Sequence, residues 1–111
     1  MNPDTSPAAI LREHLEVCAE LHALLLEENR VMRTTGEPPA EGLLARKREF
    51  LPRLDASLQR LRGINEGGAN LTQDEAAAVQ EGRKRLMQVL MLDRENERLL
   101  LKASLPDQAA H

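Results

Sequence analysis

The chain has 111 residues, a formal net charge of −3 and a single aromatic residue, Phe50. This length suits one domain with a modest core, so we expect a single helical domain over residues 1–111. The weak charge gives no long-range attraction to nucleic acid or to an anionic membrane, and one aromatic ring offers no platform for stacking bases. The abundance of Leu, Ala, Glu and Arg favours an all-α fold.

The sequence also indicates the cellular compartment in which we expect the protein. A single cysteine, Cys18, cannot form an intrachain disulfide, and residues 1–4 lack the basic-then-apolar pattern of a secretory signal. The most apolar run, residues 86–92, is far shorter than the ~20 residues that span a bilayer. We therefore expect a cytoplasmic protein without membrane insertion.

The first predicted helix covers residues 7–33. Ser6 can cap its N-terminus with Pro7 in the first turn, and Gly36 can adopt the left-handed conformation that ends a helix before Pro38 and Pro39. The short loop predicts an antiparallel return. Apolar residues recur at a seven-residue spacing and predict one buried face. They are Ile10, Leu11, Leu15, Val17, Cys18, Leu21, Leu24, Leu25, Val31 and Met32.

The second predicted helix covers residues 40–62, with Pro52 in its middle. An internal proline removes a hydrogen bond and costs about 3 kcal/mol, but the apolar stripe keeps its phase past it. We therefore predict one kinked helix rather than two short ones, followed by a loop from Gly63 to Asn70. The expected inward residues are Leu43, Leu44, Phe50, Leu51, Leu54, Leu58 and Leu61.

The third predicted helix covers residues 73–104. Thr72 and Glu75 form the capping-box pattern, and Pro106 follows the helix. Its inward stripe comprises Val79, Leu86, Val89, Leu90, Leu100 and Ala103. The three segments together predict an antiparallel three-helix bundle of long amphipathic helices with coiled-coil-like packing and short disordered termini.

The third helix carries more apolar surface than one core-facing stripe requires. Met87 and Met91 are flexible side chains that suit an adaptable binding surface, whereas Asp93 and Asn96 interrupt the stripe. Such polar groups either fix the register of a packed seam or mark where it opens to a partner. We take this surface as the candidate partner site, with burial in the bundle or in a homodimer as the alternatives. Its residues are Leu86, Met87, Val89, Leu90, Met91, Asp93, Asn96 and Leu100.

Catalytic and metal chemistry find little support. His14, Cys18 and His22 follow one another at four-residue intervals, but the two histidines are about 12 Å apart along a helix, so one ion could hold only a neighbouring pair. Ser57 and Ser104 have no patterned histidine and acidic partners. We expect no enzyme, no metal and no cofactor, with the histidines in the core or at its rim.

Three segments carry a family resemblance. Leu-Leu-Leu-Glu-Glu-Asn at 24–29, Leu-Ala-Arg-Lys-Arg-Glu-Phe-Leu at 44–51 and Asp-Arg-Glu-Asn-Glu-Arg-Leu-Leu at 93–100 resemble the FlgN type of flagellar export chaperone. The resemblance implies a cytoplasmic chaperone without a cofactor. Such a chaperone binds the C-terminal helical segments of hook–filament junction proteins and delivers them to the flagellar type III export gate. The alternative is a homodimeric coiled-coil scaffold or adaptor with no export role.

Overall fold

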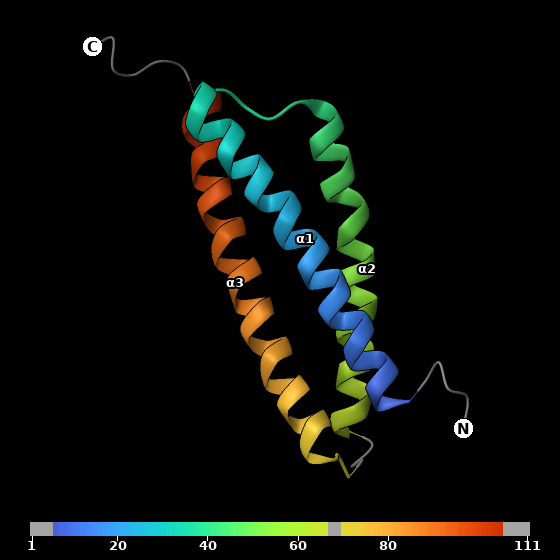
Figure 1. Ribbon diagram of the computed structural model, residues 1–111. Coiled ribbons are helices and arrows are strands. Elements are labelled where there is room, and N and C mark those ends of the chain that lie inside the picture. The colour runs from blue at the N-terminus through green and yellow to red at the C-terminus, as the bar shows by residue number, and fades with distance from the viewer. Residues whose placement is uncertain (1–5, 67–69, 106–111) are drawn as a thin grey trace.

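Three helices run the length of the molecule in the computed structural model, which describes residues 6–66 and 70–105. They are α1 (Pro7–Thr35), α2 (Glu41–Glu66) and α3 (Gln73–Ser104), and they lie side by side in alternating directions (Figure 1). The principal extents are 62 × 22 × 20 Å. The predicted all-α three-helix bundle is confirmed, whereas the termini predicted to be disordered fall mostly outside the described residues.

The ends of α1 follow from local chemistry. The Ser6 hydroxyl accepts a hydrogen bond from the Ala9 N–H at 3.2 Å, and so satisfies one of the free donors of the first turn. At the other end Gly36 has φ 69° and donates its N–H to the Met32 carbonyl at 2.9 Å. A side chain is strained at that φ, so glycine is the natural residue there.

The helix α2 differs from its prediction at the C-terminal end. It runs unbroken through Pro52, which confirms one helix over two, but it ends at Glu66 rather than at residue 62. The predicted loop start at Gly63 is therefore wrong. Ile64 lies three residues after Leu61 and is buried, so its burial against the bundle outweighs the weak helix propensity of Gly63. Residues 67–69 lie outside the described part of the chain.

The helix α3 begins as predicted. The Thr72 N–H donates to the Glu75 carboxylate at 2.9 Å, and the Glu75 N–H donates to the Thr72 hydroxyl at 3.1 Å. This reciprocal capping box satisfies two backbone donors at once. The helix ends at Ser104, and none of the described helices is both long and apolar enough to cross a membrane.

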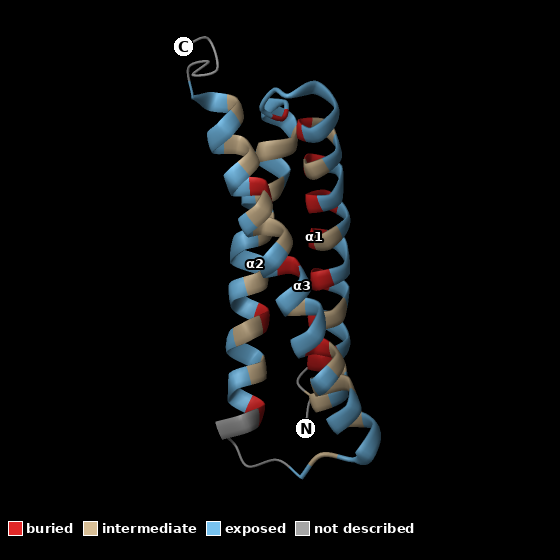
Figure 2. Ribbon diagram, turned by 90° about the vertical axis from the view of Figure 1, so that its left-hand side faces the viewer, coloured by how far each residue is buried: buried red, intermediate tan, exposed pale blue. Residues whose placement is uncertain are grey.

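The helix α1 packs against both of its neighbours, whereas no Cα atom of α2 comes within 8 Å of α3 in the described chain. The inner residues follow alternating three- and four-residue steps, as in a coiled coil, and the buried ones lie on the sides of the helices that face one another (Figure 2). On α1 the inner residues are Leu11, His14, Cys18, Leu21, Leu25, Glu28 and Met32; on α2 they are Lys47, Phe50, Leu54, Ser57, Leu61 and Ile64; on α3 they are Gly82, Leu86, Val89, Asp93, Asn96 and Leu100.

Two leucines predicted to face inward are on the surface. Leu51 is 56% exposed and Leu90 is 47% exposed. Each directly follows a residue that holds the inner position, Phe50 on α2 and Val89 on α3. Consecutive helical residues point about 100° apart, so only one of each pair can lie on the seam.

Candidate functional site

Two polar residues occupy inner positions of α1. His14 and Glu28 are 1% and 2% exposed and stand two heptads apart, about 21 Å along the helix. Buried polar groups need partners, because an unsatisfied one costs about 1–3 kcal/mol. Each of the two residues meets side chains or backbone from both α2 and α3, and we call these groups the Glu28 cluster and the His14 cluster.

The charged part of the Glu28 cluster is a bridge formed by Lys47. Its ammonium nitrogen lies 3.3 Å from the Glu28 carboxylate and 2.8 Å from the Asp93 carboxylate, so α2 is connected to both α1 and α3. Burial by itself would lower the pKa of Lys47, but the hydrogen bond and charge of Asp93, together with Glu28, outweigh that effect and raise it. Lys47 is therefore fully charged at neutral pH.

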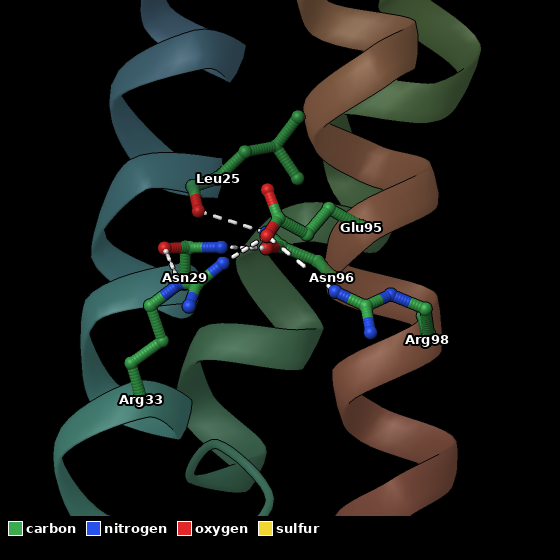
Figure 3. Close-up of polar contacts among 6 residues, drawn as sticks. All are labelled: Leu25, Asn29, Arg33, Glu95, Asn96 and Arg98. Carbon is green, nitrogen blue, oxygen red and sulfur yellow. Dashed lines mark hydrogen bonds and ion pairs between the residues drawn. The ribbon is translucent and has the colours of Figure 1, made fainter.

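Asn96 completes the same cluster from α3. Its amide nitrogen donates to the Leu25 carbonyl at 2.8 Å, and its amide oxygen accepts from Asn29 at 2.9 Å (Figure 3). The same amide nitrogen also donates to the Glu28 carboxylate at 2.8 Å. All of its polar atoms are thus used inside the bundle. Asn96 therefore acts as a register-fixing polar residue in the seam.

A surface layer covers this cluster on the α1–α3 side. Arg33 donates to the Asn29 side chain at 3.0 Å and pairs with Glu95, which also lies 3.7 Å from Arg98 (Figure 3). These side chains are about one-third to two-thirds exposed, so solvent and salt weaken their attraction. The stabilising part of the cluster is its buried interior.

The His14 cluster is neutral. The Nδ1 atom of His14 lies 3.0 Å from the Ser57 hydroxyl, and Nε2 lies 3.5 Å from the Cys18 sulfur. Gly82 on α3 faces the ring, and a Cβ there would come within 3.1 Å of His14 Cδ2. Burial lowers the pKa of His14, although a hydrogen bond with the Gly82 backbone acts in the opposite direction.

The close approach of Ser57 to His14 was not foreseen from the sequence, because 43 residues separate them. A serine beside a histidine can form a nucleophile and its base. Here both side chains are 1% exposed, and the second ring nitrogen faces a cysteine rather than an orienting carboxylate. Burial also raises the pKa of the Cys18 thiol, so it stays protonated. The contact between His14 and Ser57 connects α1 to α2.

A cavity of about 130 Å³ opens beside the His14 cluster. Helices α2 and α3 stand apart there, and Gly82, which has no side chain, forms part of the cavity wall. Its volume is close to that of an engineered apolar cavity of about 150 Å³, which accepts benzene. Its lining consists of Leu11, His14, Leu58, Leu61, Ile64, Val79, Gly82, Arg83 and Leu86.

The metal-binding pattern considered in the sequence does not assemble into a site. His14 and Cys18 are in contact, while His22 is only partly buried two turns further along α1. In the portion of the chain that the structure describes, no group of three or more His, Cys, Asp or Glu residues is arranged to hold an ion.

The eight predicted partner-site residues fall into two sets. Val89 and Asn96 are buried in the bundle, so they cannot contribute to an outer surface, and Leu86, Asp93 and Leu100 are half-buried on the same inner side. The exposed set is Met87, Leu90 and Met91.

Two further apolar residues, Leu101 and Leu105, continue this exposed set at 64% and 55% exposure. At about 100° per residue, Met87, Met91, Leu101 and Leu105 lie within about 40° of one line along α3, with Leu90 about 60° from it. We call this strip the outer face of α3. In the sequence, the apolar surplus at residues 99–101 indicated this face. Only the fold decides which side of α3 is exposed.

No protein-family model, no curated protein and no solved structure matches the chain. The class of protein that the fold defines is a small helical bundle whose third helix exposes apolar side chains on its outer face.

Proposed function

We propose that the protein binds a helical segment of another protein along the outer face of α3. In its specific form, this is a cytoplasmic chaperone for hook–filament junction proteins in flagellar type III secretion. The general proposal is supported by the structure of α3, and the specific form by the sequence resemblance.

The observation that carries the general proposal is the exposure of apolar side chains on a helix whose inner side is already packed. Leu90, Met91 and Leu101 are 47–64% exposed, while Val89 beside them is 2% exposed and in the core. Groups of apolar side chains exposed along one side of a helix indicate a surface that another molecule covers. An amphipathic helix laid along it would use the common mode of helix recognition.

The segments that carry the resemblance meet in one place. Residues 24–29, 44–51 and 93–100 contribute Glu28, Lys47 and Asn96, which bind one another in the Glu28 cluster. The resemblance therefore concerns the contacts that hold three helices in register. The identity of the client comes from the family alone.

The test is a calorimetric titration of the protein with C-terminal peptides of hook–filament junction proteins from the same genome. We expect saturable binding to one of them, at micromolar affinity or tighter. The variant Met91→Asp should abolish this binding and leave the circular dichroism spectrum unchanged, because Met91 is 63% exposed. The matched control is Leu51→Asp, which places the same charge on an exposed leucine of α2 and should bind normally.

The alternative function is a homodimeric scaffold closed by the same apolar face. It predicts a stable dimer in light scattering that Met91→Asp dissociates, and no binding of the peptides. That pair of results would overturn the chaperone proposal.

A further inference from the structure

The outer face of α3 is basic as well as apolar. Five basic side chains of α3 are exposed and lie within about 60° of the line through Met87 and Leu105. They are Arg83, Lys84, Arg94, Arg98 and Lys102. The carboxylates of α3 lie further round the helix: the nearest, Glu95 and Glu97, are about 80° away on opposite sides. Although the whole chain has a net charge of −3, this strip carries five positive charges and no negative one.

Most of these cations are free to pair with another molecule. Over the described residues, Arg94 and Lys102 form no ion pair, and Arg98 has only a 3.7 Å contact to Glu95, which Arg33 shares. The positive charge of the strip is therefore not neutralised within the bundle.

The position of the arginines within the strip indicates the kind of partner. Arg94 and Arg98 lie on its midline, between an apolar group formed by Met87, Leu90 and Met91 and a second one formed by Leu101 and Leu105. A helix that lies in a membrane surface places its cations on the polar face, outside the apolar strip, so that they remain among the lipid headgroups. Arginines on the midline suit a partner that offers carboxylates between two apolar anchors.

A second copy of the same face fits poorly. If two α3 helices pair antiparallel with Met87 opposite Leu105, Arg94 of one copy faces Arg98 of the other. In a parallel pair each arginine faces itself. Like charges placed opposite one another oppose association.

We infer that the outer face of α3 binds an acidic amphipathic helix, whose carboxylates pair with Arg94 and Arg98 and whose apolar anchors cover the two flanking groups. The anchors stand about three helical turns apart, ~16 Å, to match the spacing from Leu90 to Leu101. This inference rests on the proposed function and adds the chemistry of the partner.

The test uses three synthetic amphipathic peptides of about 20 residues with the same apolar anchors. Their two central positions carry Glu, Gln or Lys. We expect the Glu peptide to bind about tenfold more tightly than the Gln peptide, with the difference shrinking at high salt, and the Lys peptide not to bind. Equal binding of the Glu and Gln peptides would overturn the acidic-partner inference and leave the proposed helix binding intact.

A charge exchange separates this effect from loss of folding. The double variant Arg94→Glu/Arg98→Glu should bind the Lys peptide and reject the Glu peptide, which an unfolded protein cannot do. The matched control, Arg12→Glu/Arg30→Glu, reverses two exposed arginines of α1 and should keep the original preference. An unchanged preference in the α3 variant overturns the inference.

Other occupants give different results. Binding to phosphatidylserine vesicles without binding to any peptide would assign the face to a membrane, and a dimer dissociated by Met91→Asp would assign it to a second copy. Either result overturns the inference. Failure of all three peptides would overturn the proposed helix binding along with it.

Discussion

The Glu28 cluster and the His14 cluster occupy equivalent positions in the seam of α1 but close the bundle to different degrees. At Glu28 the partners are long: Lys47 and Asn96 span the space between helices and both contact the buried Glu28 carboxylate. At His14 the partners are a serine and a glycine, and a cavity of about 130 Å³ remains beside them. The difference lies in reach: the Lys47 side chain extends from α2 to Asp93 on α3, whereas the Ser57 hydroxyl bonds only to His14 on α1.

The largest expected effect comes from Lys47→Met. The substitution leaves the carboxylates of Glu28 and Asp93 close together without their cation, and breaking a buried ion pair costs about 3 kcal/mol in the free energy of unfolding. Urea denaturation followed by circular dichroism measures this loss.

The control for Lys47→Met is Arg53→Met, which removes an ion pair between α2 and α1. The Arg53 pair with Glu20 is about half exposed, so the expected loss is below ~1 kcal/mol. Equal losses in the two variants would show that the Lys47 bridge is no stronger than a surface pair.

A smaller effect is expected from Ser57→Ala. The hydroxyl is the partner of His14 Nδ1, so its removal leaves a buried nitrogen unsatisfied at a cost of about 1–2 kcal/mol. The same denaturation experiment measures it, with Gln59→Ala, an exposed site on the same helix, as the neutral control.

A double-mutant cycle sharpens the Ser57 result. In a His14→Leu background the hydroxyl has no ring nitrogen to satisfy, so Ser57→Ala should cost less than in the native chain. Additive losses would mean that the 3.0 Å contact contributes nothing to stability.

The smallest expected effect is a pH dependence that arises from His14. Burial lowers the pKa of His14 below its ordinary value of 6.5, so the unfolded chain takes up a proton more readily than the native one. The contribution of neutral His14 to the free energy of unfolding is therefore complete above about pH 6.5. It decreases as the pH falls through and below that value. The raised pKa of Lys47 affects stability only at alkaline pH, outside this window.

The measurement is the urea midpoint at pH 7.5 and pH 5.5 for the native protein and for His14→Leu. The native protein should lose more stability between the two pH values than the variant. Equal losses would assign the acid sensitivity to other groups.

The local features of the fold were predictable from short stretches of sequence. The Ser6 cap, the Gly36 stop and the Thr72–Glu75 capping box each involve residues within four positions of one another, and the structure confirms all three. The three helices follow from the same local chemistry together with the heptad spacing. The end of α2 was misplaced because Ile64 gains its stability from burial against the bundle, which no local rule records.

The candidate site was only partly predictable. An apolar surplus on the third helix could be read from the sequence, and it led to Met87, Leu90 and Met91. The sequence could not separate these from Val89 and Asn96, because neighbouring residues on a helix differ only in direction and the direction of the core is set by α1.

The sequence by itself determined three helices, their caps and the seven-residue seam, because these depend on residues near one another in the chain. Only the tertiary structure decided the partners of the polar seam residues, since Ser57 is 43 residues from His14 and Asn96 is 68 residues from Glu28. It also decided which face of α3 stays in water. Packing α1 against both neighbours fixes the inner side of every helix and leaves the apolar and basic strip of α3 outside.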